Sequence, residues 1–428
     1  MTEKVLTARF EKLDSHRLES YERDGGYKAL KKALSMKPEE VIGTVKASGL
    51  RGRGGAGFPA GMKWGFVPKE SDKPKYLCVN ADEGEPGTFK DRYIMVLDPH
   101  ALIEGAIITC YAFGAHTAYI YVRGEFKKPQ KRLQAALDEA RRAGYLGKNI
   151  LESGYDVDIW VHPGAGSYVC GEETALIESN EGKRGMPRLK PPFPAVVGLF
   201  GGPTVVNNVE TLAYVPHVIN RGPEWFASMG PEKNGGTKLF GVSGHVKKPG
   251  LYELPMGTPL REIIYDICGG IRGDKQLKAV IPGGSSTPVL KPDQIDVTMD
   301  FDSLAGIGSM FGSGGIIVMD ETTCMVRVAA RLVKFYAHES CGQCTPCREG
   351  TPWIAKILAR IEEGHGREGD IDLILDICDN IQGNTVCPAG DACAMPVRAF
   401  IQQFREEFEE HIRQKKCPIG RFPAPWQS

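Results

Sequence analysis

Residues 51–64, RGRGGAGFPAGMKW, decide what kind of fold the sequence predicts. Four glycines between residues 52 and 57 include the spacing G-x-G-x-x-G, which brings backbone N–H groups close to a phosphate or a flat ring. An ordinary Rossmann loop follows a strand, whereas residues 38–49 have a helical pattern that begins at a proline and ends at a glycine. We therefore expect a ligand-binding loop outside the usual Rossmann geometry, with a flexible turn as the alternative. The glycines are Gly52, Gly54, Gly55 and Gly57.

The sequence around this loop has the pattern of an α/β domain. Glycine occurs 52 times in 428 residues, about 12% against roughly 7% on average, so the chain turns often. Strand-like runs at 75–80 and 118–122 alternate with helix-like segments. Arg53 and Lys63 are expected to supply positive charge near the glycines. We assign residues 1–235 to this domain, including an N-terminal helical segment.

Two further domains are expected after residue 235. A hairpin on both sides of a Lys-Pro-Gly turn, one helix and a further strand predict a small β-grasp-like domain at residues 236–324, without visible ligand-binding chemistry. Apolar residues at helical spacing then predict a four-helix bundle at residues 325–428. The first two apolar stripes are Met325, Val328, Leu332 and Tyr336, and Trp353, Ile357, Leu358 and Ile361.

The overall composition excludes several classes of function. Lys plus Arg and Asp plus Glu both number 53, so no net field would attract nucleic acid or an anionic membrane. The longest apolar stretch, 101–122, contains Glu104 and His116 and predicts a helix followed by a strand rather than a membrane span. The first twenty residues have no apolar core of secretory-signal length. The 12 cysteines of such a chain indicate thiol or metal chemistry rather than disulfides.

The cysteine run at 341–347, CGQCTPC, is the most specific motif. Two residues separate successive cysteines, a spacing that lets three thiolates bind three irons of one cubane while the fourth ligand comes from elsewhere. Structural zinc is disfavoured, because zinc sites more often use two separated Cys-x2-Cys pairs. The motif therefore predicts a [4Fe-4S] cluster bound by Cys341, Cys344 and Cys347.

Three cysteines compete to be the fourth ligand, and spacing alone does not choose among them. Cys387 precedes Pro388, as in ferredoxin runs, and lies in a predicted loop. Cys378 lies on an apolar stripe, which favours core packing. Cys393 remains a rival.

Polar residues between glycines form four more motifs: NADEGEPGT at 80–88, GAGSYVCGEET at 164–174, RLKPPF at 188–193 and the pair at 207–208. Solvated turns would explain any one of them. Amide and carboxylate groups placed after strands would also hydrogen-bond a flavin ring and its ribityl chain.

Taken together, these motifs resemble the flavoprotein of about 51 kDa that oxidises NADH in respiratory complex I. The resemblance covers nearly the whole chain, because the glycine, acidic, RLKPPF and cysteine motifs follow one another in the family's order. It implies a Rossmann-like domain for FMN and NADH, a β-grasp domain and a cluster-bearing helical bundle.

The resemblance also assigns site residues. No residue is expected to be catalytic, because the cofactor carries the chemistry, and Glu85 and Glu173 are expected near the nicotinamide. Phe58, Phe66, Lys190 and Phe193 fall where the family grips NADH. FMN is expected at Gly52, Gly54, Gly55, Lys63, Asn80, Asp82, Gly171, Glu172, Asn207 and Asn208. Arg53, Gly57, Glu83, Tyr168 and Thr211 complete the expected cofactor-binding set. The family's fourth cluster ligand aligns with Cys387.

The implied activity is hydride transfer from NADH to FMN, followed by single-electron transfer to the [4Fe-4S] cluster. The implied partners are a small thioredoxin-like [2Fe-2S] subunit and a large iron–sulfur subunit. We expect a cytoplasmic protein that reaches the bacterial inner membrane through other subunits, without inserting itself. The alternative is a diaphorase subunit of a soluble NAD-linked hydrogenase or formate dehydrogenase, and a non-catalytic metal-binding scaffold is a third possibility.

Overall fold

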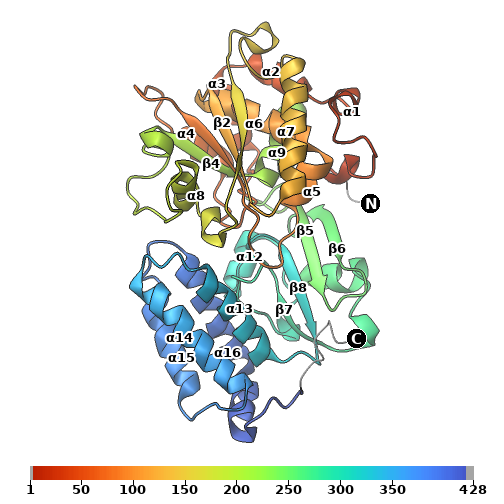
Figure 1. Ribbon diagram of the computed structural model, residues 1–428. Helices are drawn as coiled ribbons and strands as arrows, with labels where there is room; N and C mark the ends of the chain where they lie inside the picture. Colours follow the sequence, from red (N-terminus) through yellow and green to blue (C-terminus); the bar gives the residue numbers. More distant parts are fainter. Residues whose placement is uncertain (1–2, 421–428) are drawn as a thin grey trace.

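A four-stranded parallel sheet forms the centre of the N-terminal domain in the computed structural model, which describes residues 3–420 (Figure 1). The strands are β1 (Tyr76–Ala81), β2 (Thr117–Val122), β3 (Asp158–Pro163) and β4 (Thr204–Asn208), in the order β3-β2-β1-β4. Tyr76 pairs with Thr117 on one side and with Thr204 on the other. Because all strands run in parallel, their carboxyl ends meet at one edge, where open α/β sheets bind ligands.

Helices cover this sheet and build the N-terminal helical segment. They are α1 (Leu18–Arg23), α2 (Lys28–Leu34), α3 (Pro38–Ala47), α4 (Ala60–Gly65), α5 (Asp91–Leu97), α6 (Pro99–Phe113), α7 (Lys127–Arg142), α8 (Glu173–Asn180), α9 (Val209–Arg221) and α10 (Pro223–Ala227). The predicted helix and strand within 101–122 are confirmed as α6 and β2. Almost every residue of α6 is buried, and a Cβ atom at Gly105 would lie 2.0 Å from the Leu212 carbonyl oxygen. Only glycine therefore allows α6 and α9 to approach so closely.

Glu104, the acidic residue of the apolar stretch, ties the N-terminal segment to α6. Its buried carboxylate accepts hydrogen bonds from the Tyr21 hydroxyl at 2.5 Å, from Tyr27 N at 3.0 Å and from Leu30 N at 2.9 Å. These donors compensate for removing the carboxylate from water.

The middle domain contains a second four-stranded sheet of mixed direction. Its strands are β5 (Thr237–Gly244), β6 (Gly250–Pro255), β7 (Leu277–Ile281) and β8 (Gly315–Asp320), in the order β6-β5-β8-β7. The hairpin of β5 and β6 is confirmed, and the predicted helix is α11 (Leu260–Glu262) with a π-helical turn at Ile263–Ile267. The sequence prediction missed β8, which pairs in parallel with β5 at the centre of the sheet, and α12 (Phe301–Gly306).

Four helices form the C-terminal domain: α13 (Met325–Glu339), α14 (Thr345–Glu362), α15 (Asp370–Ile381) and α16 (Ala389–Gln414). The predicted stripes are correct in spacing but wrong in two details. In α13 the fully buried positions include Val326 and Val333, so Val328 and Leu332 lie at the edge of the buried face. In α14 the neighbouring Ile354 is buried, whereas Trp353 is 52% exposed. In both helices the buried face is rotated relative to the predicted stripe. Each helix packs against at least two neighbouring helices, so its buried face is wider than one row of residues.

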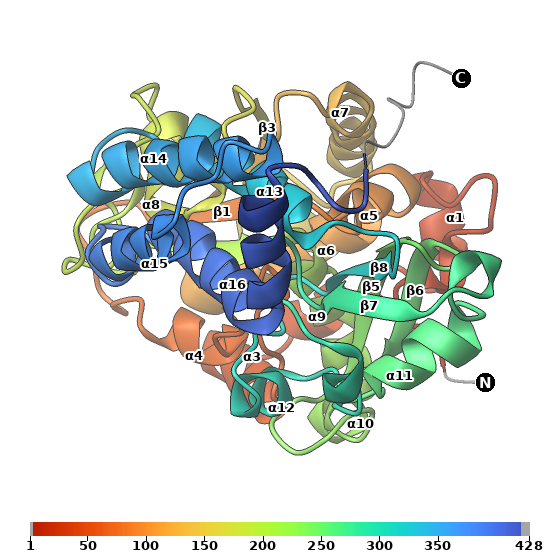
Figure 2. The same cartoon turned by 90° about the horizontal axis from the view of Figure 1, so that it is seen from below.

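The three domains contact one another. Glu253 in β6 accepts hydrogen bonds from the backbone N–H groups of Val5, Leu6 and Thr7 at 2.8–3.1 Å. The bundle lies beside the second sheet in the view from below (Figure 2), where Lys278 of β7 pairs with Glu407 of α16 at 2.7 Å.

Within residues 3–420, no single helix has the length and apolar composition of a membrane span, and α5 and α6 meet that test only as a pair bent by 102°.

Candidate cofactor and cluster sites

The glycine-rich loop lies between α3 and α4, before the first strand. This confirms the expectation that it is not an ordinary Rossmann loop, which would follow a strand. Gly52 N donates to Phe58 O at 2.9 Å, closing the loop at its base. Gly57 has φ +67°, and a Cβ atom there would lie 2.5 Å from the Phe301 ring. Beside Gly55, by contrast, a Cβ atom would make only an ordinary van der Waals contact, 3.9 Å from the carbonyl carbon of Gly312.

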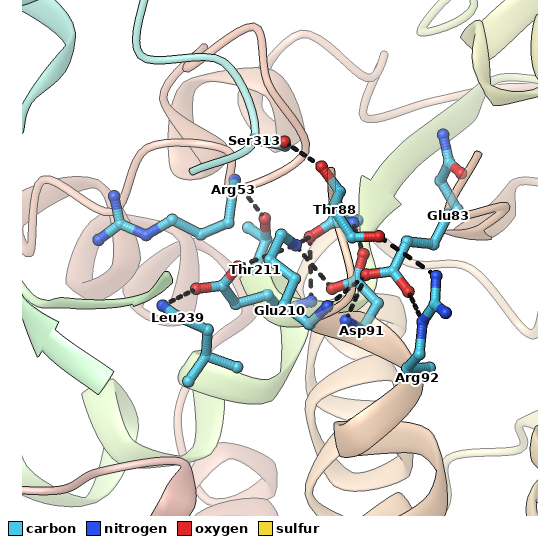
Figure 3. Close-up of polar contacts among 12 residues, drawn as sticks. Arg53, Glu83, Thr88, Asp91, Arg92, Glu210, Thr211, Leu239 and Ser313 are labelled. Carbon is cyan, nitrogen blue, oxygen red and sulfur yellow. Dashed lines mark hydrogen bonds and ion pairs between the residues drawn. The ribbon is translucent and has the colours of Figure 1, made fainter. Parts of the chain in front are cut away.

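The loop rests on the beginning of α9, at the carboxyl end of β4. Arg53 N donates to Thr211 Oγ1 at 2.8 Å, and a Cβ atom at Gly54 would lie 3.1 Å from Asn208 Cβ (Figure 3). The loop is therefore fixed to the edge of the sheet where a ligand is expected.

The side chain of Arg53 does not lie where the sequence suggested. It is fully buried, donates to Gly235 O at 2.7 Å and lies 5.7 Å from the Tyr214 ring centre. The positive charge expected near the glycines therefore lies inside the domain, where the Nε and Nη1 atoms of Arg53 have no acceptor among the described residues. Its backbone remains part of the loop.

A buried charge network lies beneath the loop and was not found from the sequence. Glu210 accepts hydrogen bonds from Lys238 Nζ at 2.7 Å and Leu239 N at 2.8 Å, and it pairs with Lys90 at 2.9 Å. Burial opposes ionisation of Glu210, yet the two lysines hold its pKa below the ordinary value. The network joins α9 to β5 and fixes the middle domain against the loop.

Two expected ligand residues have side chains already engaged by protein groups. Glu83 accepts from Lys90 N at 2.6 Å and from Asp91 N at 2.8 Å, and Arg92 Nε donates to its second oxygen at 2.7 Å (Figure 3). Asn208 caps α9 by accepting from Glu210 N at 3.0 Å, and its amide donates to Asp91 at 2.7 Å. These side chains hold neighbouring parts of the chain in place through their hydrogen bonds. A ligand would therefore contact chiefly the backbone of these residues. Asn207 is braced similarly, because its oxygen accepts from Trp64 Nε1 at 2.8 Å.

Asp82 differs from these residues because one oxygen of its carboxylate has no hydrogen-bond donor among the described residues. It follows β1 and is 92% buried, and no donor among the described residues reaches its Oδ2 atom. Burial raises its pKa to about 7, against the opposing charge of Arg123. An unsatisfied buried acceptor is costly unless a bound group supplies a donor. The hydroxyl-rich ribityl chain of FMN has donors of this kind. Nearby, Asn80 donates to Gly171 O at 2.7 Å.

Two lysines and two glutamates meet where α4 approaches α8. Glu173 accepts from Lys63 at 2.7 Å and from Lys190 at 2.7 Å. Lys190 also donates to Glu172 at 3.1 Å, while Glu172 caps α8 by accepting from Thr174 N at 2.8 Å. Burial opposes ionisation of Glu173, but Lys63 and Lys190 together hold its pKa below the ordinary value.

Glu85 connects the expected nucleotide site to the middle domain. Its carboxylate accepts from Ser286 N at 2.7 Å and from the Tyr168 hydroxyl at 2.8 Å. Burial raises its pKa, although these donors act in the opposite direction. The middle domain therefore holds Glu85 in place through the backbone of Ser286.

Three aromatic residues expected to bind NADH are exposed, which is unusual for phenylalanine. Phe58, Phe66 and Phe193 are 45%, 56% and 58% exposed. The rings of Phe58 and Phe66 lie 6.0 Å apart. Exposed, neighbouring aromatic faces suit stacking against a flat base.

The four expected cluster cysteines come from two loops of the bundle. Cys341 and Cys344 precede α14, Cys347 lies in its first turn, and Cys387 precedes α16 by two residues. The loops touch, because Val386 N donates to Cys344 Sγ at 3.3 Å. Burial, with smaller contributions from Cys341, Glu172 and Cys347, raises the pKa of Cys387 to about 12. Bound iron would deprotonate such thiols outright, so the donor set suits a cluster.

The two rival cysteines lie on helices and not in the loops. Cys378 and Cys393 are fully buried on the apolar faces of α15 and α16. His338 is exposed.

The chain is similar to known proteins over nearly its whole length. Three family models match: the Nuo51 FMN-binding domain over residues 45–217, the SLBB domain over residues 238–318, and the NADH-ubiquinone oxidoreductase-F iron-sulfur binding region over residues 327–411. The second F-type subunit of NADH-quinone oxidoreductase from Rhizobium meliloti is 56% identical over 98% of this chain and 100% of its own length. The F-type subunit of the same enzyme from Streptomyces coelicolor is 53% identical over 97% of this chain and 92% of its own.

A solved structure has a similar fold. In the NAD⁺-reducing [NiFe]-hydrogenase in the H2-reduced state, one chain matches with a TM-score of 0.83 and 36% identity, over 94% of this chain and 67% of that chain.

Proposed function

Since this chain belongs to the family of F-type subunits of NADH-quinone oxidoreductase, we propose which of its residues carry out each part of that function. The protein is the complex I component that oxidises NADH through FMN and an iron–sulfur cluster. Bound FMN supplies the acceptor for a hydride and releases the electrons one at a time. The protein itself must bind FMN and NADH, hold their reacting rings close together and set the electrostatic environment of the flavin.

We assign FMN to the carboxyl edge of the first sheet. The unpartnered Asp82 oxygen carries this assignment, since it would accept from a ribityl hydroxyl. The absence of a side chain at Gly55 supports it, since a flat ring or phosphate would approach the backbone more closely than a Cβ atom allows. Asn80 and Lys63 lie beside this edge as further polar contacts, and the remaining assigned residues act through their backbone or by bracing the site.

NADH is assigned to the adjacent exposed surface. The aromatic rings of Phe58, Phe66 and Phe193 would stack against its adenine end. Lys190 would compensate the negative charge of the nucleotide. Glu85 and Glu173 would lie near the nicotinamide, held by hydrogen bonds that prevent them from swinging away.

For the cluster, we propose Cys387 as the fourth ligand beside Cys341, Cys344 and Cys347. Its position in a loop supports this choice, as does the neighbouring Val386, whose N–H donates to Cys344 Sγ at 3.3 Å.

Finer features of the expected architecture also belong to the proposal. We divide the chain at residues 1–235, 236–324 and 325–428 and describe the first domain as Rossmann-like and the second as β-grasp-like. The partners would be a small thioredoxin-like [2Fe-2S] subunit and a large iron–sulfur subunit, in a cytoplasmic arm attached to the inner membrane through other subunits. The 56% identity to a quinone-linked relative, against 36% to the hydrogenase chain, favours this assembly over a soluble diaphorase.

The FMN assignment is tested with Asp82→Ala. Losing the buried acceptor should lower the FMN retained after gel filtration at least tenfold, with iron content unchanged. Asp98→Ala is the matched control, because Asp98 is also buried and also has one oxygen without a donor, but it lies between α5 and α6, where its other oxygen pairs with Arg9. Full FMN retention in Asp82→Ala, or equal loss in both variants, would remove the basis of the assignment.

A further inference from the structure

A group of side chains of the types that bind metal ions lies at the end of the bundle opposite the expected cluster cysteines. In residues 3–420, one set of histidine, cysteine and acidic side chains has its ligand atoms within 4.8 Å of one another: Cys324, Glu362, His411 and Cys417. Cys324 precedes α13 and Cys341 follows it, so a helix about 22 Å long at 1.5 Å per residue separates this group from the expected cluster.

The spacing of the ligand atoms fits a single ion. Cys324 Sγ lies 3.3 Å from His411 Nε2 and 3.4 Å from Glu362 Oε2, and the latter two atoms are 3.4 Å apart. A tetrahedron with metal–ligand bonds of about 2.0–2.3 Å has edges of roughly 3.3–3.8 Å. A cubane, whose four thiolates bind four different irons, needs wider spacing.

The imidazole of His411 is already oriented for a metal. Its Nδ1 atom lies 2.7 Å from Glu407 O, an acceptor that requires the proton to be on Nδ1. In the neutral ring, Nε2 is then the lone-pair atom, and it points at Cys324 and Glu362. A histidine ligand usually donates its other ring N–H to a carbonyl or carboxylate in this way.

Arg327 completes the charge balance. Its Nε atom donates to Glu362 Oε1 at 2.6 Å, and its Nη2 atom lies 3.4 Å from Cys417 Sγ. Two thiolates and one carboxylate carry three negative charges, which a divalent ion and one arginine neutralise. The backbone N–H of Arg327 also donates to Cys324 Sγ at 3.3 Å, a contact that favours the thiolate.

We propose that Cys324, Glu362, His411 and Cys417 bind one Zn²⁺ ion as a structural site. Two thiolates, one imidazole and one carboxylate form a closed tetrahedral set without an open position for substrate, and soft thiolates select zinc over magnesium or calcium. The ion would fasten the start of α13, the end of α14 and the end of α16 to the segment after α16. It stabilises the bundle without taking part in NADH oxidation.

The test uses the protein purified in its native complex. Elemental analysis should find one zinc per chain, and zinc X-ray absorption should show two sulfur neighbours at about 2.3 Å and two nitrogen or oxygen neighbours at about 2.0–2.1 Å. Absence of zinc, an extra iron in its place or a disulfide between Cys324 and Cys417 would each overturn the proposal.

A variant pair completes the test. Cys417→Ala removes the ligand that lies outside the helices, and it should lower zinc at least tenfold and reduce the melting temperature while NADH–ferricyanide activity persists. Cys268→Ala, at a buried cysteine of the middle domain, should keep its zinc. Full zinc content in Cys417→Ala would contradict the assignment. If that variant fails to fold, the absorption spectrum of the unmodified protein decides the question alone.

Discussion

Lys190 offers a sharp test of the proposed nucleotide site. Its Nζ atom lies 3.1 Å from Glu172 Oε1 and 2.7 Å from Glu173 Oε1, and Lys63 pairs with Glu173 at 2.7 Å. The two lysines therefore balance the two carboxylates. Lys190→Ala changes the charge of this group of four from zero to minus one, which would repel the phosphates of a nucleotide.

The expected magnitude follows from Coulomb's law. A unit charge about 8 Å from a phosphate contributes about 2 kcal/mol at an effective dielectric constant of about 20, and solvent screening reduces this to about 1–2 kcal/mol. The KM for NADH should therefore rise roughly five- to thirtyfold, while kcat falls less, because uniform binding is lost.

The assay is steady-state NADH oxidation with ferricyanide, together with the FMN content of each preparation. Lys183→Ala is a suitable control, because Lys183 is more exposed and pairs with Glu181 at 2.7 Å, outside the group of four. Loss of FMN from Lys190→Ala, without a change in the KM of the remaining holoenzyme, would refute the reasoning.

Three further predictions concern residues around the site and in the core. Glu85→Gln keeps a hydrogen-bonding group but removes a charge, so NADH and NAD⁺ affinities should change; unchanged affinities and flavin potential would count against the assignment. Gly57→Ala should destabilise the loop and lower FMN content, because φ is +67° and Phe301 is 2.5 Å from the new Cβ, whereas Gly65→Ala meets no atom within 4 Å and should be tolerated. Burial lowers the pKa of His100 to about 4, so unfolding takes up a proton and stability decreases as pH falls below about 6.5. Urea denaturation should show the wild type losing about 1 kcal/mol more than His100→Gln between about pH 7.5 and 5.5, and equal losses would show that His100 does not cause the effect.

Local patterns in the sequence predicted much of the fold. The helix before the glycines indicated that the loop does not follow a strand, and the structure has it between α3 and α4. Helical periodicity predicted four helices after residue 325, because one buried face imposes a repeat of 3.6 residues. The cysteine run at 341–347 was informative because its three ligands are close in sequence.

Features that depend on distant partners were not predictable in this way. Arg53 is polar, and nothing in its neighbours along the chain shows that it is buried against Tyr214 and Gly235. Glu210 and Lys238 are 28 residues apart, and their pairing requires the contact between two domains. The proposed zinc group is dispersed more widely still, since its first and last ligands, 324 and 417, are 93 positions apart in the sequence. Its cysteines therefore resemble ordinary buried cysteines in the sequence.

The most direct test of the account is an anaerobic addition of NADH to the purified protein, followed by optical and paramagnetic resonance spectra. NADH should bleach the flavin absorption and produce the signal of a reduced [4Fe-4S] cluster in the wild type and in Cys393→Ala. Cys387→Ala should retain FMN and its bleaching but lose or severely weaken the cluster signal. An unbleached flavin in the wild type would contradict the proposed site, and a signal abolished by Cys393→Ala but preserved in Cys387→Ala would contradict the ligand assignment.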